Sequence, residues 1–222
     1  MSLPGDAIAA VFFDLDGTLV DSAPDLVVAM ARLRAELGEP DLDVAHIGHV
    51  VSKGGRAMLR RGFPGADEAR IDELLPRFLD LYAEAIATHT RTYAGIDDVL
   101  AAFDARGIRW GVVTNKPGRL ARAVMAALAL DARCAALVSG DCLPLRKPDP
   151  APLLHACALA GVSAAGSIYV GDDARDIEAG RRAGMRTVAA AWGYLDGDDA
   201  SAWGADRVVV TPSGLLPALG LG

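Results

Sequence analysis

The sequence predicts an α/β fold, in which a parallel β-sheet carries helices on both faces and an all-α unit is inserted near the N-terminus. Beyond residue 94, short apolar runs alternate with helical patterns, which is typical of βαβ units. An uncharged apolar run at residues 7–13 is a candidate buried strand. Between these two regions, residues 21–92 contain no convincing strand pattern. A chain of 222 residues can form one large domain with such an insert.

Five apolar runs of the C-terminal region are candidate strands, and helical patterns lie between them. Proline stands at the start of two of these helices, at Pro117 and Pro150, and glycine directly follows two of them, at Gly107 and Gly161. Proline favours the first turn of a helix and glycine its end. The strands are expected at 108–114, 135–139, 167–171, 187–191 and 207–211, and the helices at 96–106, 117–130, 150–160 and 174–183.

The insert is expected to be entirely helical. Helical patterns cover residues 24–37, a short piece near 43–50, residues 55–61 and residues 67–89, and Pro76 should split or kink the last of these. The chain therefore divides into a discontinuous Rossmann-like core, residues 1–20 and 93–222, and a helical cap, residues 21–92.

Composition limits the possible partners. The net charge of −7 and the pI near 5.0 argue against nonspecific binding to nucleic acid or to anionic membranes. The chain lacks an apolar run long enough to span a membrane, and Asp6 and Asp14 interrupt the N-terminal segment, which has no basic leader. Three cysteines without C-x-x-C spacing suit a reducing compartment. We expect a cytoplasmic protein with a small-molecule partner; its oligomeric state is unknown from sequence.

Acidic and polar residues follow several of the predicted strands. Asp14-Leu15-Asp16-Gly17-Thr18 comes directly after the first apolar run. Because ligands of parallel sheets bind outside the carboxyl ends of the strands, these residues should meet at one edge. Paired carboxylates there predict a metal ion or a shared proton. An all-oxygen site suits Mg²⁺, whereas the histidines are not placed to bind zinc. The other members of the set are Thr114, Asn115, Lys147, Asp172, Asp173 and Asp176.

This set of motifs resembles the haloacid dehalogenase superfamily of aspartate-nucleophile phosphotransferases. The motifs occur in the order of that family, and the helical insert lies where family members with an α-helical cap have theirs. Within the family the chain is similar to bacterial phosphoglycolate phosphatases and to N-acetylmuramic acid 6-phosphate phosphatases. The four motifs are Asp14-Leu15-Asp16-Gly17-Thr18, Val113-Thr114-Asn115-Lys116-Pro117, Lys147-Pro148-Asp149-Pro150 and Val170-Gly171-Asp172-Asp173 with Asp176.

The resemblance implies a Mg²⁺-dependent phosphomonoesterase that acts on a small phosphorylated metabolite, such as 2-phosphoglycolate. Asp14 would attack phosphorus and Asp16 would act as acid and base. The metal would be held by Asp14, Asp172 and the backbone carbonyl of Asp16. Phosphate would be bound by Gly17, Thr18, Thr114, Asn115 and Lys147. Asp173 and Asp176 would orient the metal waters and Lys147, and either of them could instead bind the metal directly. In the cap, Lys53 and Arg56 would recognise a substrate carboxylate.

Other functions remain open on the same scaffold. A phosphomutase would share every core residue named above. A dehalogenase lacks the acid at the position of Asp16, which argues against that chemistry. A phosphonate hydrolase needs a cap lysine, and Lys53 is the single lysine of residues 21–92. A non-catalytic binding module should have lost at least one of the four central residues, but Asp14, Asp16, Lys147 and Asp172 are all present.

Overall fold

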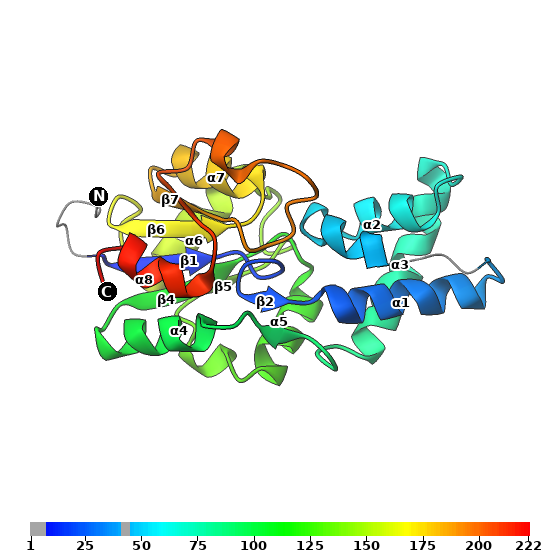
Figure 1. The fold of residues 1–222 in the computed structure, drawn as a ribbon, viewed down its shortest axis with the longest axis horizontal. Coiled ribbons are helices and arrows are strands. Elements are labelled where there is room, and N and C mark those ends of the chain that lie inside the picture. The colour runs from blue at the N-terminus through cyan, green and yellow to red at the C-terminus, as the bar shows by residue number, and fades with distance from the viewer. Residues whose placement is uncertain (1–7, 41–44) are drawn as a thin grey trace.

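A computed structural model describes residues 8–40 and 45–222, and it contains a six-stranded sheet beside a group of three helices (Figure 1). All adjacent strands of this sheet are parallel, in the order β5-β4-β1-β6-β7-β8. The predicted α/β fold is confirmed. The strands are β1 Ala10–Phe13, β4 Arg109–Val113, β5 Leu137–Val138, β6 Ser167–Gly171, β7 Arg186–Ala190 and β8 Arg207–Val209.

The central strand β1 has no exposed residue, because helices cover both faces of the sheet. Val11 and Phe13 pack with one set of helices, and Ala10 and Phe12 with the other, as expected from the alternation of side chains along a strand. The first face is covered by α4 Ile96–Ala105, α5 Gly118–Ala127 and α8 Leu215–Ala218, and the second by α6 Ala151–Ala160 and α7 Ala174–Arg182.

The remaining three helices lie to the right of the sheet in Figure 1: α1 Ala23–Glu36, α2 Gly55–Gly62 and α3 Glu68–Glu84. Of the two expected effects of Pro76, the split is wrong, since α3 continues through it, and the kink stays a prediction. Packing explains this result: Ile71, Leu74 and Phe78 on one side of α3 are buried against α1 and α2, which offsets the hydrogen bond that proline removes. The short helix expected near 43–50 corresponds to a 3₁₀ helix at Ala45–Lys53, and residues 43 and 44 lie outside the described residues.

The two connections between the core and these helices form a small antiparallel ribbon, β2 Val20–Asp21 with β3 Arg91–Thr92. The sequence-based expectation of no strand within residues 21–92 is therefore wrong at both ends, because two-residue strands are too short to show alternation. The division into core and cap at residues 20/21 and 92/93 stays a prediction, and both junctions lie in this ribbon.

A buried carboxylate joins the two connections just outside the ribbon. Asp25, in the first turn of α1, accepts hydrogen bonds from the backbone N–H of His89 (2.8 Å) and Thr90 (2.9 Å) and from the Thr90 hydroxyl (2.6 Å). Burial alone would raise the pKa of Asp25, but these hydrogen bonds outweigh it and hold the pKa below its ordinary value. Asp25 thus fixes the returning segment against the start of α1.

Candidate active site

Strand register brings the predicted residues to one edge of the sheet. Phe13 of β1 is paired with Val112 on β4 and with Val170 on β6. The residues that follow these positions, Asp14, Thr114 and Asp172, are all buried at the carboxyl ends of the strands. The juxtaposition therefore follows from the topology.

Three buried carboxylates form a cluster at this edge. Asp14, Asp172 and Asp176 each offer an oxygen atom within 4.8 Å of the others. Burial raises the pKa of Asp172, and the nearby Asp14 and Asp176 carboxylates raise it further; burial also raises the pKa of Asp176, against the opposing effect of Lys147. A set of hard oxygen donors around one point could hold a divalent cation. Asp176 thus joins the acidic cluster, a direct role that the sequence left open.

Lys147 is the cation of this cluster. Its ammonium group lies 2.9 Å from Asp14 and 2.8 Å from Asp176, and its side chain is 2% exposed. It also donates to the Tyr169 hydroxyl at 2.8 Å, which in turn donates to the Val113 carbonyl. Burial would lower the pKa of Lys147, but the two carboxylates outweigh burial and raise it. The lysine is therefore held charged beside the predicted nucleophile.

Asn115 positions Lys147 through its backbone. The Asn115 side-chain amide donates to the Lys147 carbonyl (3.0 Å) and accepts from the Lys147 N–H (3.1 Å). Thr114 accepts a hydrogen bond from the Lys116 N–H at 3.2 Å, and this bond leaves the hydroxyl hydrogen available for a bound anion. Phosphate binding by Thr114 and Asn115 stays a prediction, and the side chain of Asn115 has the further role of fixing Lys147.

The loop after β1 folds tightly against Asp172. Gly17 has a φ of +83°, and a Cβ atom there would overlap the Asp172 carboxylate, so glycine is required. The N–H of Gly17 donates to the Val20 carbonyl (2.9 Å), and the Thr18 hydroxyl donates to Asp172 (2.8 Å). Because the Thr18 N–H also bonds within the loop, to Leu15, this arrangement does not support the predicted use of these two amides for phosphate, which stays a prediction.

A serine from the cap side reaches the same carboxylate. The Ser52 hydroxyl donates to Asp172 at 2.5 Å and lies 3.5 Å from the carbonyl oxygen of Asp16. The Asp16 carbonyl and the Asp172 carboxylate, both predicted metal ligands, therefore face a common point. Ser52 is a contact that sequence analysis did not assign, although it directly precedes Lys53.

Lys116 is a second buried cation, and it pairs with Asp16. Its ammonium group lies 2.9 Å and 3.0 Å from the two Asp16 oxygens and 3.1 Å from the Tyr82 hydroxyl of α3. Ser22 donates to the same Asp16 carboxylate at 2.5 Å. The sequence signal for Lys116 was its place directly after Thr114-Asn115, but nothing in the sequence showed that it would turn toward Asp16.

Asp173 lies beside the cluster and caps α7. Its side chain accepts from the Arg175 N–H, while the Asp173 N–H donates to Asp176, which forms a capping box. Asp173 also forms an ion pair with the Arg175 guanidinium at 2.7 Å. These contacts orient Asp176, and the predicted role of Asp173 in ordering metal waters stays a prediction.

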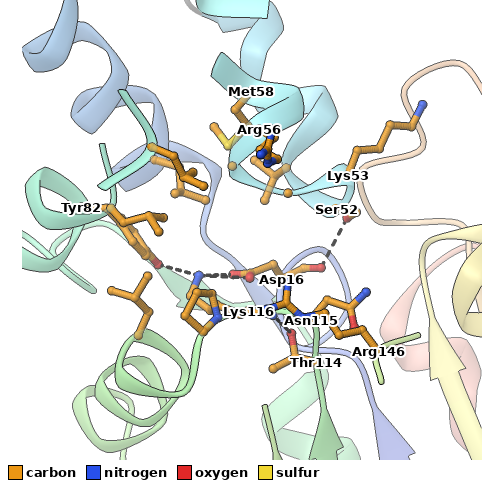
Figure 2. A pocket seen from close by; sticks show the side chains of 18 of the residues that line it. Asp16, Ser52, Lys53, Arg56, Met58, Tyr82, Thr114, Asn115, Lys116 and Arg146 are labelled. Atoms are coloured by element: carbon orange, nitrogen blue, oxygen red, sulfur yellow. Dashed lines mark hydrogen bonds and ion pairs between the residues drawn. The ribbon is translucent and has the colours of Figure 1, made fainter. Parts of the chain in front are cut away.

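The two cap cations predicted to bind a substrate carboxylate have carboxylate partners in the protein. Lys53 lies 2.8 Å from Asp196 and 3.6 Å from Asp198, in the loop after β7. Arg56 pairs with Glu68 at 3.2 Å and with Asp72. Lys53 extends away from Asp16 in Figure 2. These ion pairs do not support the predicted substrate role.

A cavity of about 430 Å³ opens over these groups. Figure 2 shows Met58, Arg56 and Ser52 on its cap side and Thr114, Asn115 and Arg146 on the opposite side, with Asp16 and Lys116 between them. The cap and α5 also give it an apolar wall, formed by Leu26, Met58, Leu75, Phe78, Leu79 and Leu120. The edge of the sheet that carries Asp14 is thus one wall of a cavity that the cap completes.

Comparison with known proteins decides the family. Residues 11–190 match the model of the haloacid dehalogenase-like hydrolases. The chain belongs to this family. The predicted resemblance is confirmed, and the protein is a hydrolase.

Within residues 8–40 and 45–222, no helix has the length and apolar character needed to span a bilayer.

The similar proteins carry two different names. The chain is 46% identical over 204 residues to phosphoglycolate phosphatase of Xanthomonas campestris pv. campestris strain 8004, covering 91% of this chain and 92% of that protein. It is 43% identical over 214 residues to N-acetylmuramic acid 6-phosphate phosphatase of Pseudomonas aeruginosa, covering 96% and 95%. A crystal structure of a predicted phosphoglycolate phosphatase from Haemophilus somnus 129PT superposes with a TM-score of 0.84 at 26% identity, covering 95% and 97%.

The buried position of Lys147 predicts a large effect on stability. In Lys147→Met, the largely buried Asp14 and Asp176 carboxylates lose their shared cation. The free energy of unfolding should therefore fall by about 3 kcal/mol, measured by urea denaturation at neutral pH without added metal.

Lys53→Met is the matched control, since Lys53 also pairs with two aspartates but is 37% exposed. Its loss should cost less than about 1 kcal/mol. Equal losses in the two variants would contradict the account of Lys147 given above.

Proposed function

We propose that this chain is a Mg²⁺-dependent phosphomonoesterase that forms an aspartyl-phosphate, an acyl phosphate, on Asp14. The observation that carries the proposal is the contact between Asp14 and the buried Lys147, next to two further carboxylates and at the wall of a cavity. Mg²⁺ suits the oxygen donors of this cluster, and when bound it would offset the negative charge of the ester phosphate. Family membership supports the same chemistry.

The reaction would proceed in two displacements. An Asp14 oxygen attacks phosphorus, the bond from phosphorus to the ester oxygen breaks, and Asp16 gives that oxygen a proton. Water then attacks the phosphorus of the aspartyl-phosphate while Asp16 takes a proton from it, which releases phosphate and restores Asp14. Thr114 and Lys147 would bind phosphoryl oxygens in both steps.

Two substrates are candidates, and both carry a carboxylate. The relatives named phosphoglycolate phosphatase support 2-phosphoglycolate. Two observations support the second candidate, N-acetylmuramic acid 6-phosphate. The cavity of 430 Å³ is larger than a two-carbon leaving group fills, and such a group would leave its apolar wall without contact. In addition, the relative from Pseudomonas aeruginosa is named N-acetylmuramic acid 6-phosphate phosphatase.

Asp14→Asn should lower phosphate release from p-nitrophenyl phosphate by about 10³-fold or more, because an amide cannot replace the nucleophile. Chelation of metal from the wild-type protein should have a similar effect, reversed by Mg²⁺. The control is Asp131→Asn, an exposed aspartate of the core surface, which should keep full activity. Sustained turnover by Asp14→Asn with unchanged thermal unfolding would exclude Asp14 as nucleophile.

Lys116→Met should displace Asp16 and so impair protonation of the leaving group. We expect kcat/KM for an alkyl phosphate to fall by about 10²-fold. The value for p-nitrophenyl phosphate should change little, because its leaving group needs no proton and kcat/KM reports only the steps up to its release. Tyr82→Phe, which removes only the hydroxyl contact of Lys116, is the control. Equal losses on both esters would argue against a link between Lys116 and the acid.

The substrate is tested by comparing kcat/KM for 2-phosphoglycolate and N-acetylmuramic acid 6-phosphate with the wild-type enzyme. If the leaving group fills the cavity, the sugar phosphate should be preferred by at least about tenfold, since each apolar contact adds transition-state binding. A preference for 2-phosphoglycolate would instead show that the apolar wall does not contact the substrate. Formation of an isomerised sugar phosphate without phosphate release would favour a phosphomutase.

A further inference from the structure

Six cationic side chains line the cavity, and five of them already have a carboxylate partner within the protein. Lys147 pairs with Asp14 and Asp176, and Lys116 pairs with Asp16. The other three pairs are Lys53 with Asp196, Arg56 with Glu68, and Arg175 with Asp173. Among residues 8–40 and 45–222, no carboxylate lies within ion-pair distance of the sixth, Arg146.

We infer that Arg146 is the residue that recognises the carboxylate of the substrate. This inference rests on the proposed function, since both candidate substrates carry a carboxylate besides the phosphate. A substrate carboxylate that approached Lys53 or Arg56 would replace one carboxylate partner by another, with little net gain. At Arg146 it would form a new pair, and a guanidinium group can bind a carboxylate through two parallel hydrogen bonds.

The backbone around Arg146 is well fixed, which suits a recognition residue. The Arg146 carbonyl accepts the Asp149 N–H at 2.8 Å, and the next residue, Lys147, is held on both backbone polar groups by Asn115. Two successive residues therefore serve one cavity: Lys147 places a buried ammonium beside Asp14, and Arg146 places an exposed guanidinium on the cavity wall near Thr114 and Asn115 (Figure 2).

The test uses two pairs of esters that differ in the carboxylate-bearing group: 2-phosphoglycolate with ethyl phosphate, and N-acetylmuramic acid 6-phosphate with N-acetylglucosamine 6-phosphate. The measured quantity is the ratio of kcat/KM for the carboxylated ester to that for its partner. We expect the effect in the pair that the wild-type enzyme hydrolyses faster. In Arg146→Ala the ratio for this pair should fall by about tenfold, which is the usual contribution of a charge-assisted hydrogen bond. The loss should appear in KM, and Arg146→Lys should recover part of it.

Arg56→Ala is the matched competitor, because Arg56 lines the same cavity but has carboxylate partners; its ratio should equal that of the wild type. Three outcomes would overturn the assignment. The ratio could be unchanged in Arg146→Ala, it could fall equally in Arg56→Ala, or the wild-type enzyme could fail to prefer the carboxylated ester in either pair. If the wild-type protein with Mg²⁺ hydrolyses none of the four esters or p-nitrophenyl phosphate, the proposed function itself fails, and this assignment fails with it.

Discussion

The site depends on the balance of charge around Lys147. Asp14, Asp172 and Asp176 are buried within 4.8 Å of one another, and Lys147 is the ammonium group that contacts two of them. With all four groups ionised, three negative charges and one positive charge leave a net charge of −2, which is the charge that one divalent cation would neutralise. Without either cation the carboxylates would repel one another in a medium that screens poorly. Metal binding and structural integrity at this edge are therefore aspects of one electrostatic requirement.

The loop after β7 connects this charge cluster to the cap. The N–H of Tyr194 donates to Asp172 at 2.9 Å, and the Tyr194 hydroxyl donates to Asp21 of the ribbon at 2.5 Å. Two residues further, Asp196 accepts the ion pairs of Lys53 and Arg61 from the cap. One short loop thus contacts a proposed metal ligand, the connection to the cap and the cap itself. A change in the position of the cap would therefore alter the hydrogen bonds that Asp172 accepts from Tyr194 and Ser52.

The sequence predicted the centre of the site better than its surroundings. Asp14, Thr114 and Asp172 could be placed together because each follows an apolar strand, and parallel strands present the same ends at one edge. The position of Asp176 in the acidic cluster, by contrast, depends on how α7 begins, and the capping box that sets it is a matter of side-chain geometry. Lys116 meets Tyr82, and Ser52 meets Asp172, from segments that are far apart in the sequence, and no local pattern encodes either contact.

Lys53 and Arg56 show why cations in a cap segment are weak evidence for a substrate site. Their sequence context, two cations around paired glycines, is the same whether they face a ligand or a carboxylate of the protein. The structure gives both of them protein partners, and the side chains of Lys53 and Arg56 are 37% and 43% exposed. An ion pair of such an exposed cation contributes less than about 1 kcal/mol. Of the two, only Lys53 links the cap to the core, through Asp196 and Asp198, because the partners of Arg56 lie on α3 within the cap. The ion pairs of Lys147 and Lys116 are instead largely buried, beside the proposed reacting groups Asp14 and Asp16. The exposed and the buried ion pairs therefore differ in how strongly they fix the residues that form them.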